Sequence, residues 1–257
     1  PRTDTDFTVA KLTANGALDA TWGTSGRFTL DIQESNATAR ALHVLGDGSV
    51  IAGGYANSPG VGTTQPVLYR LTPAGALDAN FATGGLFHET VLTLQTEVYN
   101  FAIDGNKLTT AGYGRNAGTT NDWVALRFNT TTGARDTNFG NAPNGAVMID
   151  PSGMMLGSNC RNALALPGGK TALIGSTGPS NMPAQDGAVA ILDVNGKLDT
   201  HFGTGVNVFP LGPSSNDQFW SGAVASNKLL VTGWRGGGMT QTDTVNDDAH
   251  AVVFELD

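Results

Sequence analysis

One segment recurs four times along the chain, about once every 60 residues, and it constrains the fold more than any other feature. Each copy carries an aspartate, an aromatic residue three positions later and a glycine-rich turn. The aspartates are Asp19, Asp78, Asp136 and Asp199. A fixed period of this length is typical of a solenoid, a propeller or another repeat array.

Other segments repeat in the same phase and predict four strands per repeat. Two apolar runs joined by a tight turn, such as Asp104-Gly105-Asn106, predict a hairpin because these turn residues accept positive φ at little cost. The hairpins span 43–55, 101–113, 164–176 and 222–234. Alternating segments at 7–12, 67–71, 123–128, 188–192 and 251–256 predict a third strand, and segments at 27–30, 86–89, 146–149 and 206–209 predict a fourth.

The order of hairpin, third strand, turn and outer strand predicts an all-β fold, a β-propeller with four-stranded blades. A parallel β-helix is the alternative, although its rungs are shorter. No apolar 3.6-residue period is long enough for a helix. We expect four to five blades in a single domain over 1–257, with repeats at roughly 6–65, 66–121, 122–186 and 187–248 and a partial repeat at 249–257.

The third strand occurs five times, whereas the hairpin and the outer strand occur four times, so the chain starts and stops inside a repeat. In one interpretation the N-terminal segment completes the blade begun by residues 220–234 and closes the ring. In the other, the chain is an incomplete five-bladed ring or a segment of a longer chain.

The pattern Gly-x-Leu-Asp-x-x-Phe-Gly-x-x-Gly, followed by a hairpin that ends in Ala-Gly-Tyr, resembles the delta-60 repeat, a family of bacterial β-propeller repeats. The resemblance covers nearly the whole chain, with departures at Ala82, Arg135 and the insertion at 141–143. It implies the propeller fold and a secreted or cell-surface location. The family has no common catalytic motif, so the resemblance carries over no catalytic residue.

The composition narrows the range of partners. A net charge of −8 and a pI near 4.8 argue against nucleic acid and anionic membrane surfaces. No apolar run reaches the length of about 20 residues that spans a bilayer. The lone Cys160 excludes an internal disulfide. We therefore expect a protein or a glycan as the partner, and the sequence leaves the oligomeric state open.

We expect the four repeat aspartates to be structural. A residue that every repeat needs normally caps the N–H groups of its turn, and the aromatic residue beside it packs between blades. The alternative is a set of four repeated ligand pockets, as in some propeller lectins.

A function used once needs residues that differ between repeats, and the connectors from each outer strand to the next hairpin vary most. Gap-free alignment of the four hairpins gives one equivalent position at Arg40, Val98, Arg161 and Phe219. The next equivalent position, or level, is at Ala41, Tyr99, Asn162 and Trp220. We expect these levels to face the ring axis. The candidate ligand-binding residues are Asp31, Glu34, Arg40, Glu97, Tyr99, Asn100, Arg161, Asn162, Asp217 and Trp220. The alternative is a solvated rim in which the arginines pair with the carboxylates.

The sequence contains no catalytic motif, metal-ligand spacing or cofactor fingerprint. Calcium could use the oxygen atoms of 104–106 or 243–248, although neither segment follows an EF-hand loop. We expect a secreted or surface binding module. One alternative is a propeller hydrolase or lyase acting on a carbohydrate or lactone, which needs two candidate carboxylates to converge within roughly 5–10 Å. Another is a purely structural segment of a larger surface protein.

Overall fold

The computed structural model describes residues 4–32, 35–58, 62–142, 144–178, 185–211, 216–236 and 248–256. These residues form 17 strands, and the helical structure among them is limited to a 3-10 turn at Pro167–Gly169. The prediction of an all-β fold is therefore confirmed.

The three complete repeats form three groups of four strands each, and one parallel bridge between Thr64 and Gln95 joins the first two groups into an eight-stranded sheet. The first group is β3 (Ala37–Val44), β4 (Val50–Asn57), β5 (Thr64–Leu71) and β6 (Leu86–His88). The second is β7 (Gln95–Asp104), β8 (Lys107–Arg115), β9 (Asp122–Asn129) and β10 (Ala146–Ile149), and the third is β11 (Ser158–Leu166), β12 (Lys170–Thr177), β13 (Asp186–Leu192) and β14 (Val206–Phe209). Consecutive strands of a group pair antiparallel in the predicted order of hairpin, third strand and outer strand.

Two partial groups flank the complete ones. At the N-terminal end β1 (Phe7–Ala10) pairs with β2 (Arg27–Leu30), as a third strand with its outer strand. At the C-terminal end the hairpin β15 (Gln218–Ala225) and β16 (Lys228–Arg235) pairs with β17 (Asp248–Glu255). Because β17 fills the third-strand position beside β16, β1 does not complete this group, which corrects the first interpretation of ring closure.

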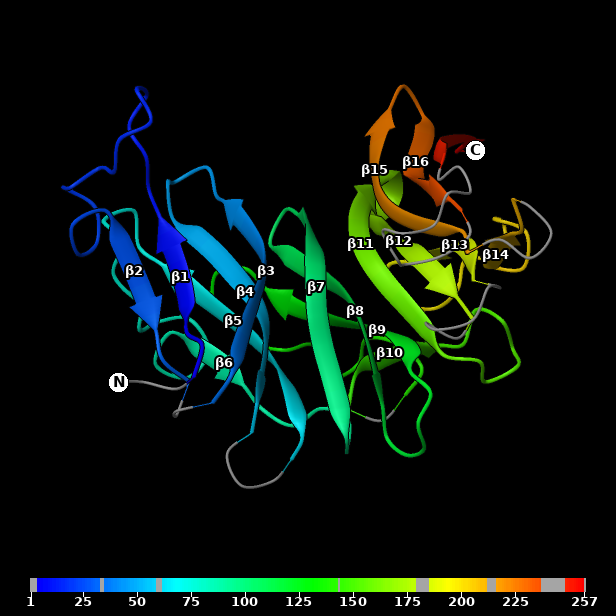
Figure 1. The fold of residues 1–257 in the computed structure, drawn as a ribbon, viewed down its shortest axis with the longest axis horizontal. Coiled ribbons are helices and arrows are strands. Elements are labelled where there is room, and N and C mark those ends of the chain that lie inside the picture. Colours follow the sequence, from blue (N-terminus) through cyan, green and yellow to red (C-terminus); the bar gives the residue numbers. More distant parts are fainter. Residues whose placement is uncertain are drawn as a thin grey trace.

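The five groups follow one another along an open arc, with β1 and β2 at one end and β15 to β17 at the other (Figure 1). The first strands of the hairpins contact one another in the order β3, β7, β11, β15. These strands therefore form the inner side of the arc, where side chains from different repeats meet.

The repeat aspartates cap their turns. Each carboxylate accepts a hydrogen bond from the backbone N–H two residues later, and the donors are Thr21 at 3.1 Å, Asn80 at 3.1 Å, Asn138 at 3.0 Å and His201 at 3.1 Å. These bonds satisfy turn N–H groups that the strand ladders leave unpaired.

A basic side chain pairs with the aspartate of every repeat. In three repeats it comes from the third strand, in the pairs Lys11–Asp19 at 3.0 Å, Arg70–Asp78 at 3.5 Å and Arg127–Asp136 at 3.0 Å. In the remaining repeat Ile191 holds that strand position, and Lys170 from β12 reaches Asp199 at 2.5 Å instead. Hydrogen bonds from Lys170 and His201 lower the pKa of Asp199 to about 2.

In three of the four repeat turns, the aromatic residue is buried against the following repeat. Trp22, Phe81 and Phe139 are buried, and a Cβ added to Gly75 would lie 2.6 Å from the ring of Trp22. Backbone hydrogen bonds cross the same joints, from Gly23 to Ala74, from Ala82 to Thr132 and from Gly140 to Asn195, at 2.7–2.8 Å. Each of these three joints is thus held by one buried ring and one backbone hydrogen bond.

Candidate functional site

A β-bulge in the first strand of every hairpin leaves one residue without a pairing partner on the second strand. The bulged residues are Arg40, Tyr99, Arg161 and Trp220. The gap-free alignment, which set Arg40 level with Val98 and Arg161 level with Phe219, is therefore wrong by one residue in two hairpins. Between the bulged residue and the glycine of the second strand, the β3–β4 and β11–β12 hairpins have one more residue (41–53 and 162–174) than β7–β8 and β15–β16 (100–111 and 221–232), and an alignment without gaps cannot show this.

A glycine on the second strand makes room for each bulge. An added Cβ would lie 1.9 Å from the carbonyl oxygen of Thr38 at Gly54, and 1.7 Å from that of Glu97 at Gly112. The same holds for Gly175 and Gly233, where an added Cβ would lie 2.1 and 1.8 Å from a carbonyl oxygen. Only a residue without a side chain fits at such a distance, so the bulge and its glycine form one structural unit.

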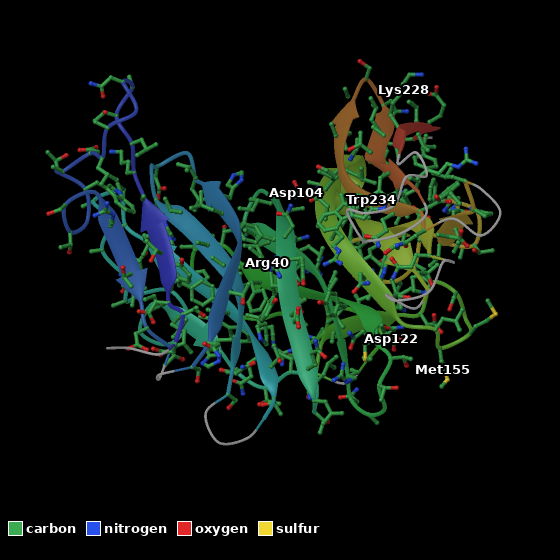
Figure 2. The ribbon with its side chains drawn as sticks, viewed as in Figure 1. Arg40, Asp104, Asp122, Met155, Lys228 and Trp234 are labelled. Carbon is green, nitrogen blue, oxygen red and sulfur yellow. The ribbon has the colours of Figure 1, made fainter. Side chains whose placement is uncertain are left out.

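The bulged residues and the aromatic residues after three of these glycines form a continuous row on the inner side of the arc. We call it the inner ladder, and it consists of Arg40, Tyr55, Tyr99, Tyr113, Arg161, Trp220 and Trp234. Figure 2 shows two of its members, Arg40 on β3 and Trp234 on β16, on the strands of the first and last hairpins. The structure thus brings together four candidate residues that lie far apart in the sequence.

Rings and guanidinium groups alternate along the ladder. Arg40 stacks on Tyr99 with its Cζ 4.3 Å from the ring centroid, and Arg161 lies 4.7 Å from the same ring. Arg161 also lies 4.6 Å from Trp220, so it joins the two halves of the ladder. Cation–π contacts of this kind contribute about 0.5–1 kcal/mol each at exposed sites.

Hydrogen bonds and ring contacts fix the two ends of the ladder. The Arg40 guanidinium donates to the hydroxyl of Tyr55 at 2.9 Å, and the hydroxyls of Tyr99 and Tyr113 are 2.8 Å apart. At the other end the rings of Trp220 and Trp234 lie 5.2 Å apart. Arg40 is exposed and Trp220 is 41% exposed, so both ends remain accessible to a ligand.

A chain of amide hydrogen bonds runs beside the ladder. Asn100 donates to the side-chain oxygen of Asn162 at 2.7 Å, and Asn162 donates to the hydroxyl of Ser221 at 3.2 Å. These residues directly follow the bulges of three repeats. The two candidate asparagines therefore link neighbouring repeats and hold the bulges in line.

Glu97 is the candidate carboxylate that borders the ladder. Gln95 donates a hydrogen bond to it at 2.6 Å, and its side chain is buried. Burial raises the pKa of Glu97, against the opposing effects of hydrogen bonds from Gln95, Tyr113 and Tyr99 and of the charge of Arg40. The site therefore contains a carboxyl group whose ionisation costs folding free energy.

The substitution Glu97→Gln is expected to change how stability depends on pH. A carboxyl with a raised folded-state pKa costs no stability below its unfolded pKa of about 4.3; the cost grows as the pH rises from there to the folded-state pKa, and it is constant above that. The variant, which cannot ionise, should match the wild type in denaturant midpoint at acidic pH and exceed it at neutral pH. A difference that stays constant across this range would contradict the assignment.

Two other candidate carboxylates belong to different surroundings, and Glu34 lies outside the described residues. The carboxylate of Asp31 lies within 4.8 Å of those of Asp4 and Asp6. Asp217 is buried and accepts a hydrogen bond from the backbone N–H of Leu211 at 2.9 Å. The candidate carboxylates Asp31, Glu97 and Asp217 thus have three different sets of neighbours.

The two segments considered for calcium stand differently in the structure. Asp104-Gly105-Asn106 is the tip of the β7–β8 hairpin, and 243–247 lies outside the described residues. The acidic cluster that the structure does show is that of Asp4, Asp6 and Asp31. Asp4 and Asp6 precede β1 whereas Asp31 follows β2, so no local sequence pattern brings these aspartates together.

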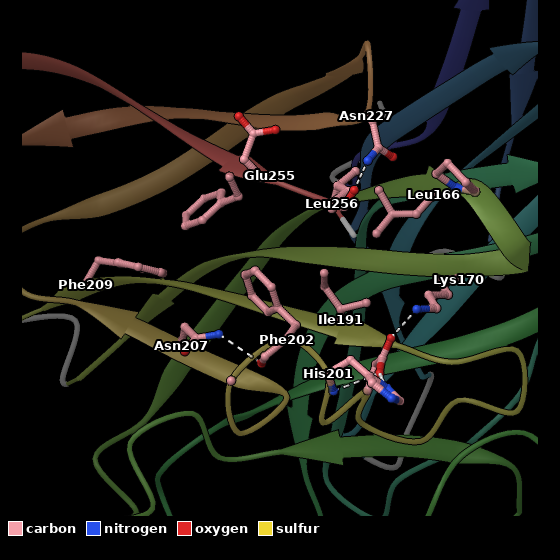
Figure 3. A pocket seen from close by; sticks show the side chains of 14 residues that line it. Leu166, Lys170, Ile191, His201, Phe202, Asn207, Phe209, Asn227, Glu255 and Leu256 are labelled. Carbon is pink, nitrogen blue, oxygen red and sulfur yellow. Dashed lines mark hydrogen bonds and ion pairs between the residues drawn. The ribbon is translucent and has the colours of Figure 1, made fainter.

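A cavity of about 340 Å³ lies between the third repeat and β17 (Figure 3). Its lining combines apolar side chains, among them Phe202, Phe209, Phe254 and Leu256, with polar and charged ones that include the ion pair of Lys170 and Asp199. In the preceding joint the corresponding ring, Phe139, packs against Gly196 of the next repeat turn. The cavity is thus the place that a following turn fills elsewhere, and we assign no ligand to it.

The sequence analysis missed three aromatic members of the ladder, Tyr55, Tyr113 and Trp234. The signal was present, because each directly follows the glycine that ends the hairpin pattern. These residues were read as part of the repeated fold, whereas their rings lie beside the variable bulge residues. Serine replaces the aromatic residue in the third hairpin, at Ser176.

Residues 45–81 match a family described as a β-propeller domain of unknown function (DUF5122). No curated protein matches the chain. The match covers the β4–β5 region and the repeat turn that ends at Phe81, the segments in which the repeat is most regular. Together with the all-β groups of strands, it indicates a β-propeller domain of unknown function. The described residues contain no helix long and apolar enough to cross a membrane.

Proposed function

We propose that the chain is a binding module whose inner ladder binds a glycan. The observation that carries this proposal is the unbroken row of rings and guanidinium groups across four hairpins. Ring faces stack on the apolar faces of sugars, and guanidinium groups donate paired hydrogen bonds to polar oxygen atoms. The partial exposure of Trp220 gives a sugar access to this surface.

The wider setting follows from the repeat pattern. We propose a secreted or cell-surface bacterial module of the delta-60 kind, with four to five blades when its ring is complete. The acidic net charge of −8 fits a partner other than nucleic acid. A protein partner is the alternative occupant of the ladder.

Two alternative functions differ in what they require of the site. A hydrolase or lyase that acts at the ladder needs two convergent carboxylates there. The carboxylates that lie close together are those of Asp4, Asp6 and Asp31, none of which belongs to the inner ladder, and Glu97 is buried. A purely structural segment would bind no ligand at the ladder. The binding module is favoured because the ladder is the part of the inner strands that varies between repeats.

The double substitution of Arg161→Ala with Trp220→Ala tests the proposal on a glycan array. We expect the affinity for any bound glycan to fall at least about 100-fold, because two central contacts of about 2 kcal/mol each are lost. Arg27→Ala, on the outer strand β2, is the control and should bind like the wild type. Unchanged glycan binding by the double variant would rule out the ladder. A pull-down that yields a protein, combined with an array that shows no glycan, would identify the alternative partner.

A further inference from the structure

The two arginines of the inner ladder differ from the arginines of the third strands in what they contact. Arg70 and Arg127, on third strands, each form an ion pair with the aspartate of their own repeat. Among the described residues, neither Arg40 nor Arg161 forms an ion pair with a carboxylate. Within that part of the chain, no direct contact with a carboxylate neutralises the charges of the ladder.

Arg161 is enclosed by rings and not by hydrogen-bond acceptors. Its Cζ lies 4.6 Å from the ring centroid of Trp220, 4.7 Å from that of Tyr99 and 5.8 Å from that of Tyr113. Over the described ranges of the chain its guanidinium has no hydrogen-bond partner, and its Nε atom is buried. A guanidinium carries five N–H donors, and a donor withdrawn from water without an acceptor costs free energy. Because the side chain is only half-buried, a ligand can reach the remaining donors.

Arg161 also lies in the interior of the arc. Its strand, β11, contacts β7 on one side and β15 on the other (Figure 1). The rings around it come from both neighbours, with Tyr99 and Tyr113 on the β7–β8 hairpin and Trp220 on β15. This place is therefore formed by contacts between neighbouring hairpins, and it does not depend on the surfaces at either end of the arc.

The charge around this place is positive. Arg40 lies against the same Tyr99 ring, with its Cζ 4.3 Å from the centroid, so two guanidinium groups share one ring. The acidic side chain beside them, Glu97, is buried, and burial raises the pKa of its carboxyl group. A raised pKa keeps this group closer to its neutral form, which preserves the excess of positive charge at the ladder.

We propose that the two guanidinium groups of the ladder bind the anionic group of an acidic sugar, either the carboxylate of a uronic acid or a sulfate ester. The inference rests on the proposed glycan binding and names the class of glycan. Arg161 offers parallel N–H donors that match two oxygen atoms of such a group. The anion supplies the acceptors that the described residues do not offer to Arg161, and the exposed part of Trp220 stacks on the sugar ring.

The net charge of −8 does not oppose such a ligand. Exposed charges are screened beyond about 8 Å at physiological ionic strength, so the groups in contact with the ligand decide the binding. Two guanidinium groups suit anionic groups that are spaced along a glycan. They do not suit nucleic acid, whose affinity comes from a larger number of contacts with closely spaced phosphates.

A glycan array of matched pairs tests the proposal. It contains uronic acid oligosaccharides beside the same oligosaccharides with each carboxyl reduced to a hydroxymethyl group, and sulfated oligosaccharides beside their unsulfated forms. We expect the wild type to bind an acidic member at least about tenfold more tightly than its neutral partner, since hydrogen bonds to charged groups contribute about 1.5–3 kcal/mol. Arg161→Gln should lower the affinity for the acidic member about 10- to 100-fold and that for the neutral one much less. Preference within the uronic acid pairs identifies the carboxylate as the anion, and preference within the sulfated pairs identifies the sulfate.

Lys107→Gln, at the exposed tip of the β7–β8 hairpin, is the matched control because it also removes one positive charge, and it should bind like the wild type. Arg161→Lys keeps the charge without the planar donor pair and should retain part of the preference. Circular dichroism of each variant separates loss of binding from loss of fold. Equal binding of acidic and neutral partners would overturn the inference and leave the proposed glycan binding intact, whereas an array without any bound glycan would overturn the proposed function itself. An acidic peptide bound through Arg161 in place of any acidic glycan would also overturn the inference.

Discussion

Replacement of Gly112 by alanine is expected to lower the free energy of unfolding by at least about 3 kcal/mol. The Cβ would lie 1.7 Å from the carbonyl oxygen of Glu97 and 3.2 Å from the Cα of Val98. Both neighbours are backbone atoms, so no side chain can turn away, and the bulge at Tyr99 must shift. The loss is comparable with a large part of the stability of a typical domain.

Gly46→Ala is the matched control for this substitution. Gly46 lies in the turn of the first hairpin, and an added Cβ there meets nothing within 4 Å. Both substitutions change the conformational entropy of the unfolded chain by the same amount. They differ in how much room the native fold leaves for the added methyl group. The denaturant midpoint of Gly112→Ala should therefore be clearly lower than that of Gly46→Ala. A Gly112→Ala variant as stable as Gly46→Ala would mean that the bulge adapts freely.

The Gly112 substitution also affects the inner ladder, because Tyr99 is the bulged residue and Tyr113 directly follows Gly112 on the other strand of the hairpin. A shift of this backbone changes the position of Tyr99 between Arg40 and Arg161. The stability of the bulge and the geometry of the ladder therefore depend on the same glycine. Repeated glycines of this kind serve the fold and the site together.

The strands could be predicted from the sequence because their signals are local. The outer strands at 27–30, 146–149 and 206–209 agree with β2, β10 and β14 residue for residue. The alternation of apolar and polar residues and the turn residues are signals that span only a few positions. The same signals recur in phase in every repeat, which strengthens the prediction of each strand. The bulges could not be predicted in this way, since a bulge depends on the length of the turn that follows it.

The candidate site residues also differ in how far the sequence could place them. Arg40, Tyr99, Arg161 and Trp220 were identified because they vary at a fixed place in a repeated pattern, and the structure brings them together. Asp31 and Asp217 were grouped with them only because they lie in the same connectors. Connectors follow irregular paths, so neither position in the sequence nor charge indicated where those carboxylates would lie.

Phe139→Ala is expected to cost about 3–5 kcal/mol, because the substitution empties a fully packed joint between repeats. The ring is 1% exposed and lies under the guanidinium of Arg127 at 4.1 Å. It also covers Gly196 of the next repeat turn. The variant loses the buried ring, the cation–π contact and the cover of that turn at once.

Phe202→Ala is the control that the repeat itself supplies. Phe202 holds the same position in its turn, but it lines the open cavity beside β17 and is only partly buried. Because less surface leaves water there on folding, the substitution should cost about 1–2 kcal/mol. Thermal unfolding of the two variants measures the difference. Equal losses would show that the ring acts within its own turn, and a larger loss at Phe139 would show that stability comes from the joint. In repeat proteins the neighbour interface carries much of the stability of each unit, and we therefore expect the second result.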